Sequence, residues 1–131
     1  MAPEFFLDRS LGRKKLATAL RNAGWRVATL SEVYGVQHGQ LVADTTWISE
    51  QADAGRVLLT SDARILSDPG ERQAIVSASA LMFTFPSARM RSEDHFARLS
   101  THRARLADIA IRDDVPAAYV LYERTISRVL P

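Results

Sequence analysis

Short apolar runs alternate with longer amphipathic stretches along this 131-residue sequence, and the alternation limits the folds that the chain can adopt. Strands that alternate with helices favour a mostly parallel sheet with helices on both faces. Runs such as VLL and ALMF are apolar at every position, which is typical of strands buried on both sides. The sequence therefore predicts a three-layer α/β/α sandwich with a mostly parallel sheet, as a single domain over residues 1–131.

Local signals place the individual elements. Ser10 can cap a first helix, and Gly24 is positioned to end it. The glycine-punctuated stretch SEVYGVQHG is expected to be a loop, and the pair Asp68 and Pro69 is typical of the start of a short helix. The predicted strands are 5–7, 26–30, 56–60, 80–85 and 118–122, and the predicted helices are 11–23, one from 40–44 to 55, 69–77 and 92–111.

Two of the predicted strands end in a carboxylate. The run FFLD ends at Asp8, and RVLLTSD ends at Asp62. The C-terminal ends of parallel strands meet at one edge of a sheet, so these acids become neighbours if the third strand pairs with the first on the side opposite the second. Ligands of such sheets bind at that edge. The alternative for Asp62 is an ordinary turn that it opens with Ser61.

Two further acids are expected near the same edge. Glu32 follows the end of the second strand, and Asp44 precedes a predicted helix. Asp44 also fits a helix N-cap, and Glu32 also fits a solvated loop residue. Converging carboxylates raise one another's pKa values, and a divalent cation removes that cost. An all-oxygen set favours Mg²⁺ or Mn²⁺ over zinc.

Composition narrows the classes of protein that the chain can represent. The absence of cysteine excludes disulfide scaffolds, thiolate zinc sites and cysteine nucleophiles, and the three widely spaced histidines disfavour a histidine-rich zinc site. No apolar run approaches the roughly 20 residues that span a bilayer, and the N-terminus lacks the plan of a signal peptide. We therefore expect a cytoplasmic protein with no membrane partner.

The basic residues are unevenly distributed. Residues 9–26 contain six basic side chains and no acid, and residues 89–112 contain six arginines and two histidines, although the net charge is only +2. Such clusters favour a polyanionic partner. The alternative for each single arginine is an ordinary solvated helix face.

The first half of the chain resembles a known family. The segments FFLDRSLGRKKLATALRNAGWRV, EVYG, VADTTWI and GRVLLTSDARI cover about residues 4–66. In this order and spacing they are similar to the PIN-like domain, the nuclease fold of VapC-type toxins from bacterial toxin-antitoxin pairs. The chain departs from the pattern at Arg64, where many relatives have a second acid two residues after the third-strand aspartate.

The resemblance implies a function for these residues. Asp8, Asp44 and Asp62 would be the catalytic, metal-binding acids, with Glu32 or Asp68 completing the set around Mg²⁺ or Mn²⁺. The implied reaction is hydrolysis of RNA phosphodiester bonds. The basic residues that would contact the RNA are Arg9, Arg13, Lys14 and Arg64, and Arg64 has the alternative role of neutralising the acids.

The same resemblance implies partners and leaves rival functions open. A toxin needs a cognate antitoxin protein, and self-association into a homodimer is also expected, with nothing in the sequence to locate the interface. The first rival is a PIN-like binding module for RNA or protein that lacks a complete acidic site. The second is a phosphoacceptor receiver-like domain, which is disfavoured because there is no acidic pair at the first strand and no lysine beyond Lys15. A dinucleotide-binding fold is weaker still, since the first turn lacks a G-x-G-x-x-G motif.

Overall fold

The computed structural model describes residues 2–112 and 114–130, which form a sheet of six strands in the order β2-β1-β3-β4-β5-β6. The strands β1 to β5 are mutually parallel, and β6 pairs with β5 in the antiparallel direction. The predicted parallel sheet is therefore confirmed, including the pairing of β3 with β1 on the side opposite β2. The strands are β1 Glu4–Leu7, β2 Arg26–Thr29, β3 Val57–Leu59, β4 Leu81–Thr84, β5 Ala117–Leu121 and β6 Ile126–Leu130.

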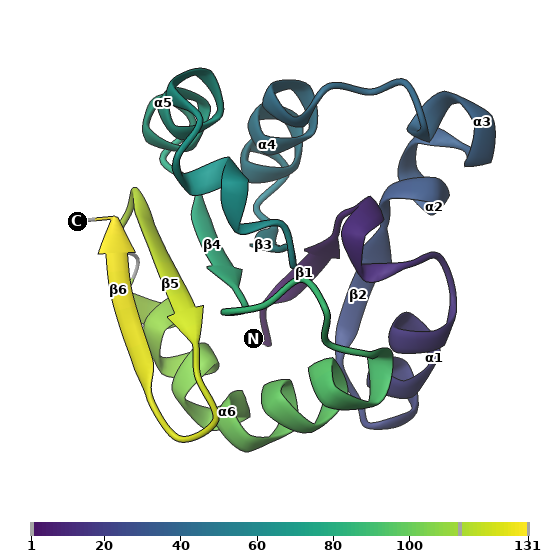
Figure 1. Cartoon of the computed structure of the whole chain (residues 1–131), viewed down its shortest axis with the longest axis vertical. Helices are drawn as coiled ribbons and strands as arrows, with labels where there is room; N and C mark the ends of the chain where they lie inside the picture. The colour runs from purple at the N-terminus through teal and green to yellow at the C-terminus, as the bar shows by residue number, and fades with distance from the viewer. Residues whose placement is uncertain (1, 113, 131) are drawn as a thin grey trace.

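Helices cover both faces of the sheet, as Figure 1 shows. One buried cluster joins the sheet to α1 and α6, and a second joins its other face to α4 and α5. The three-layer α/β/α sandwich is therefore confirmed. The α-helices are α1 Lys15–Asn22, α2 Leu30–Tyr34, α3 Val36–Gly39, α4 Asp44–Asp53, α5 Pro69–Ser77 and α6 Ser92–Arg112, and the short 3-10 helices are η1 Arg9–Leu11 and η2 Ala63–Leu66.

The two cores follow from the alternation of side chains along each strand. Phe5 of β1 belongs to the core beneath α1 and α6, where its ring lies 5.1 Å from that of Trp25. Phe6, the next residue, belongs to the opposite core, where its ring lies 5.4 Å from that of Trp47 in α4. Every residue of β3 is buried, because helices cover this central strand on both sides. The uninterrupted apolar runs of the sequence are thus explained.

The first predicted helix has a different start. Instead of one helix over 11–23, the chain forms η1 and then α1, and Ser10 does not cap α1. Asp8 caps η1 by accepting a hydrogen bond from the backbone N–H of Ser10, so the cap lies two residues before the predicted one. Gly24 does follow the helix end as predicted, with a φ of 89° that favours glycine.

Two further expectations were wrong. The stretch 31–39 lies largely within α2 and α3 rather than in a loop. The start of α2 is fixed by a capping box, in which Thr29 and Glu32 each accept a backbone N–H of the other. The strand predicted at 118–122 is not the last one, because the chain turns back after β5 and adds β6 as an edge strand.

Residues 1, 113 and 131 fall outside the described residues. The single domain over residues 1–131 stays a prediction. None of the helices in the described part of the chain combines the length and the apolar character that a bilayer crossing requires.

The central strand provides a test of the fold. Leu58 of β3 is fully buried and belongs to the core beneath α4 and α5. We expect Leu58→Ala to lower the free energy of unfolding by about 2–5 kcal/mol, because it removes buried apolar atoms and leaves a cavity. Chemical denaturation measures the change. The control Val129→Ala, on the exposed face of β6, should cost less than about 1 kcal/mol, and an equal cost in both variants would contradict the layer arrangement.

Candidate functional site

The ends of β1 and β3 lie side by side at the C-terminal edge of the sheet. The backbone N–H of Asp8 donates to the carbonyl oxygen of Leu59 at 3.2 Å, so the strand pairing extends to the acid itself. Asp62 follows the end of β3 by three residues. The predicted meeting of these two strand ends is therefore confirmed, and both acids follow buried strands at the centre of the sheet.

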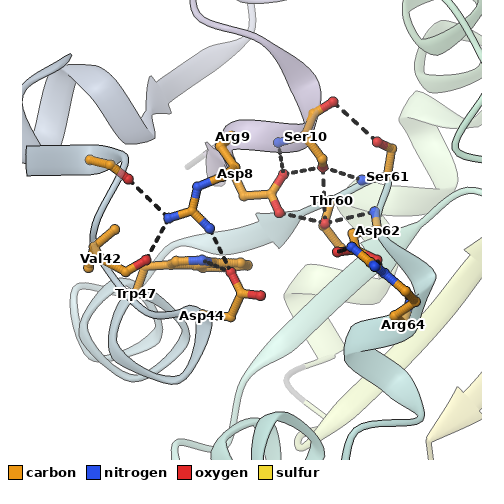
Figure 2. Close-up of polar contacts among 11 residues, drawn as sticks. Asp8, Arg9, Ser10, Val42, Asp44, Trp47, Thr60, Ser61, Asp62 and Arg64 are labelled. Atoms are coloured by element: carbon orange, nitrogen blue, oxygen red, sulfur yellow. Dashed lines mark hydrogen bonds and ion pairs between the residues drawn. The ribbon is translucent and has the colours of Figure 1, made fainter. Parts of the chain in front are cut away.

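Three hydrogen-bond donors hold the carboxyl group of Asp8 in place, and only 2% of the residue is exposed. Its Oδ1 accepts hydrogen bonds from the backbone N–H of Ser10, at 3.0 Å, and from the Ser10 hydroxyl. Its Oδ2 accepts a hydrogen bond from Thr60 Oγ1 at 2.6 Å, as Figure 2 shows. The carboxyl group is thus fixed in one orientation by residues that flank both strand ends.

The hydroxyl groups around Asp8 also bind the two strand ends to each other. The backbone N–H of Ser61 donates to Ser10 Oγ at 2.8 Å, and the backbone N–H of Asp62 donates to Thr60 Oγ1 at 3.0 Å (Figure 2). Ser61 Oγ completes the contact by donating to the carbonyl oxygen of Ser10 at 3.2 Å. The sequence TSD therefore does more than close a turn, because it orients Asp8 and sets the backbone position of Asp62.

Burial raises the pKa of Asp8 from 3.8 to about 6, because desolvation disfavours the charged form. The hydrogen bonds from Ser10 and Thr60 lower the pKa and so oppose this effect, whereas the negative charge of Asp44 adds to it. The Asp8 carboxyl group is therefore harder to ionise than that of an exposed aspartate.

Asp44, the first residue of α4, is oriented by two donors. Arg9 Nη1 lies 3.1 Å from Asp44 Oδ1, and Trp47 Nε1 donates to the same oxygen at 2.8 Å. The Arg9 guanidinium also donates through Nη2 to the carbonyl oxygens of Gly39, at 3.0 Å, and Val42, at 2.5 Å (Figure 2). Arg9 therefore joins the end of β1 to the segment that precedes α4, and it sets the position of Asp44.

Asp62 is paired with the residue that replaces the expected second acid. Arg64 Nε donates to Asp62 Oδ1 at 2.9 Å, and Arg64 Nη2 donates to Oδ2 at 3.0 Å. This guanidinium holds the pKa of Asp62 below its ordinary value of 3.8. Asp62 is thus ionised at neutral pH, with both oxygens occupied by an arginine of the same turn.

Glu71 is an acid of this edge that sequence reasoning missed. It lies in the first turn of α5, which Asp68 caps by accepting the backbone N–H of Glu71 at 2.9 Å. Partial burial, the charge of Asp44 and a hydrogen bond with Asp44 raise the pKa of Glu71 to about 7, and Asp68 and Asp62 contribute further. The available signal was the sequence DPGE at a helix start, directly after the turn that contains Asp62.

Glu32 has contacts of a different kind from those of the other predicted ligands. Its Oε1 accepts hydrogen bonds from Arg21 Nη2 at 2.6 Å and from the backbone N–H of Thr29 at 2.9 Å. The Arg21 guanidinium is the main cause that lowers the pKa of Glu32. The structure explains Glu32 as a helix-capping residue, and its role as a metal ligand stays a prediction.

The donors at this edge fit Mg²⁺ or Mn²⁺ in their chemistry, because Asp8, Asp44, Asp62 and Glu71 offer only carboxylate oxygens. They are not assembled as a metal centre. Within residues 2–112 and 114–130, no three acidic or histidine side chains are arranged to hold one ion. The reason is visible in Figure 2: hydroxyl groups bind Asp8, and arginines bind Asp44 and Asp62. A cation at Asp62 would therefore compete with the Arg64 guanidinium.

Asp8 and Asp62 follow the ends of β1 and β3, and Asp44 begins α4, so three acids lie at the C-terminal edge of a parallel sheet. This arrangement agrees with the family that sequence comparison identifies. The sequence profile described as "PIN like domain" matches residues 3–87, more than half of the chain, and the chain belongs to this family. It is 35% identical over 125 residues to a protein of Mycobacterium tuberculosis (strain ATCC 25618 / H37Rv) named "Putative ribonuclease VapC45". That alignment covers 95% of this chain and 90% of the relative. A comparison with solved structures found no significant match.

The buried acid makes the site costly for stability. Folded Asp8 keeps its proton up to about pH 6, whereas an unfolded chain releases it near 3.8, so stability falls as the pH rises through this window. We expect Asp8→Asn to raise the free energy of unfolding at pH 7.5 by about 1–3 kcal/mol, with the gain vanishing near pH 4. Denaturation at both pH values measures this. The exposed control Asp53→Asn should show no such pH-dependent gain, and a destabilised Asp8→Asn at pH 7.5 would contradict the argument.

Proposed function

We propose that this chain is a metal-dependent endoribonuclease that acts as the toxin of a toxin-antitoxin pair. The observation that carries the proposal is the buried Asp8 at a shared strand edge with Asp62, where Asp44 adds to the charge that a cation would balance. Membership of the PIN-like family and the relative named as a ribonuclease support the same activity. The proposed place of action is the cytoplasm.

In this proposal Asp8, Asp44 and Asp62 hold Mg²⁺ or Mn²⁺, and Glu71 supplies the carboxylate that position 64 lacks. The bound metal would supply an activated water and would stabilise the charge that develops on the phosphate. Ser10 and Thr60 keep the Asp8 carboxylate aimed at the edge. Asp8 is the central ligand in this proposal because it is the most deeply buried of these acids.

The RNA backbone would approach across the surface next to the acids. Arg13 and Lys14 are exposed between η1 and α1, within reach of solvent and of a polyanion. Arg9 and Arg13 line a groove of about 320 Å³, together with Ser31 and Gln40. Phosphate contacts of this kind are sequence-independent and salt-dependent. Arg9 and Arg64 already bind acids, so in this proposal Arg13 and Lys14 make the first contacts with RNA, and RNA contacts by Arg9 and Arg64 stay a prediction.

The proposed partners follow from this function. A cognate antitoxin protein would cover the acidic edge, which is formed by Asp8, Asp44, Asp62 and Glu71, and the basic residues around it. RNA would be the substrate. A homodimer is part of the proposal without an assigned interface.

A non-catalytic PIN-like binding module is the second candidate, and one observation favours it. Arg64 occupies both oxygens of Asp62, so the acids as they stand are partly neutralised by the protein itself. Metal-dependent cleavage distinguishes the enzyme from the module, because a module would bind RNA through its arginines whether or not a divalent cation is present.

Cleavage of total RNA tests the proposed activity. The purified chain should cut RNA with Mn²⁺ or Mg²⁺ and should not cut it with EDTA. Asp62→Asn keeps the side-chain shape and should lower the rate by about 100-fold or more, consistent with several kcal/mol of metal-assisted stabilisation of the transition state. Circular dichroism establishes that the variant is folded. Equal cleavage by both proteins, or none by either, would remove Asp62 from the mechanism and favour the binding module.

The role of Glu71 has its own test. Glu71→Gln removes one charge from the acidic edge, so we expect Mn²⁺ binding, measured by titration calorimetry, to weaken by about 10-fold, as for other changes around metal sites. Glu123→Gln is the matched control, because Glu123 is an exposed glutamate in the turn between β5 and β6. Unchanged Mn²⁺ binding in Glu71→Gln would limit the metal site to the three aspartates.

A further inference from the structure

The contact between Asp62 and Arg64 involves both carboxylate oxygens of Asp62. The guanidinium donates from Nε to one carboxylate oxygen at 2.9 Å and from Nη2 to the other at 3.0 Å, which is a two-point fork (Figure 2). The backbone N–H of Arg64 donates to Oδ1 as well, at 3.1 Å. While this arrangement persists, a cation that approaches Asp62 meets the positive guanidinium on both carboxylate oxygens and competes with it.

The ion pair between Asp62 and Arg64 can break without a rearrangement of the fold. The Arg64 side chain is 89% exposed, whereas that of Asp62 is 25% exposed. The two residues are neighbours in one turn at the start of η2, so no packed element has to move when the arginine swings into solvent. Exposed ion pairs of this kind contribute little to stability, so the loss of this contact costs the fold little.

Arg64 also interacts electrostatically with the other acids at this edge of the sheet. The negative charges of Glu71 and Asp44 also act on the Arg64 guanidinium, in addition to the direct contact with Asp62. Arg9 provides the corresponding positive charge at Asp44, but it is tied to two backbone carbonyls as well. Arg64 is therefore the movable positive charge of the two, and Arg9 is the fixed one.

We propose that Arg64 is an internal counter-ion that competes with the divalent cation for Asp62 and must leave before the site can load. The inference rests on the proposed function, because it concerns the same acids. Arg64 then sets the metal concentration at which the protein becomes active. It acts by occupying a ligand and takes no part in the chemical step.

Binding of Mn²⁺ to the intact chain tests this inference. The dissociation constant is measured by electron paramagnetic resonance of unbound Mn²⁺, without RNA. We expect Arg64→Gln to bind Mn²⁺ about 3–10-fold more tightly than the wild type, because it removes both a competitor for Asp62 and a repelling charge. Arg64→Lys keeps the charge but loses the fork, so its affinity should lie between the two.

Two control variants make the result specific. Arg105→Gln removes the same charge from an exposed position on α6, and its Mn²⁺ affinity should stay within about twofold of the wild type. Adding Arg64→Gln to Asp62→Asn should give a smaller gain than adding it to the wild type, because the contested ligand has already lost its charge.

The outcomes separate this inference from the proposed function. If Arg64→Gln binds Mn²⁺ no more tightly than the wild type while cleavage still requires metal and Asp62, then the counter-ion role is wrong and the nuclease stands. If neither the wild type nor Arg64→Gln binds Mn²⁺ and neither cuts RNA, both proposals are overturned. Arg64 is exposed, so loss of folding in either variant would itself contradict the picture of a side chain free to swing.

Discussion

The rest of the site depends on the burial of one carboxyl group, that of Asp8. Burying an acid costs free energy, and here the cost is met partly by hydrogen bonds from Ser10 and Thr60. Those donors in turn bind the backbone of Ser61 and Asp62, so the hydrogen bonds that stabilise the buried acid also align the second strand end. The demand of one residue for donors thus organises both turns at the edge of the sheet.

The remaining acids are stabilised in a different way, by positive charge from the chain itself. Asp44 is paired with Arg9, and Asp62 is paired with Arg64, whereas Glu71 lies against Asp44 without a comparable arginine and shows a raised pKa. The arginines therefore balance only part of the negative charge at this edge of the sheet. The proposed cation would balance the charge that the arginines leave unpaired.

The sequence was informative where the answer depends on strand order and chain direction. The alternation of elements predicted the parallel sheet, and the sheet required that Asp8 and Asp62 share an edge. The sequence was less informative about contacts that depend on how the chain runs between the strands and helices. Glu71 reaches the site only because η2 turns the chain before α5, and the pairing of Arg9 with Asp44 joins residues far apart in the sequence. The sequence pattern did not predict α2 for another reason. The capping-box sequence TLSE is present, but Thr29 both ends β2 and caps α2, and the predicted strand ran on to residue 30.

The attachment of Arg9 has a mechanical consequence. Arg9 directly follows Asp8 in the chain, and its guanidinium is bonded to the carbonyl oxygens of Gly39 and Val42 and to Asp44. A displacement of the end of β1 is therefore transmitted to the start of α4 through one side chain. The spacing between Asp8 and Asp44 is therefore set in part by the length and the contacts of the Arg9 side chain.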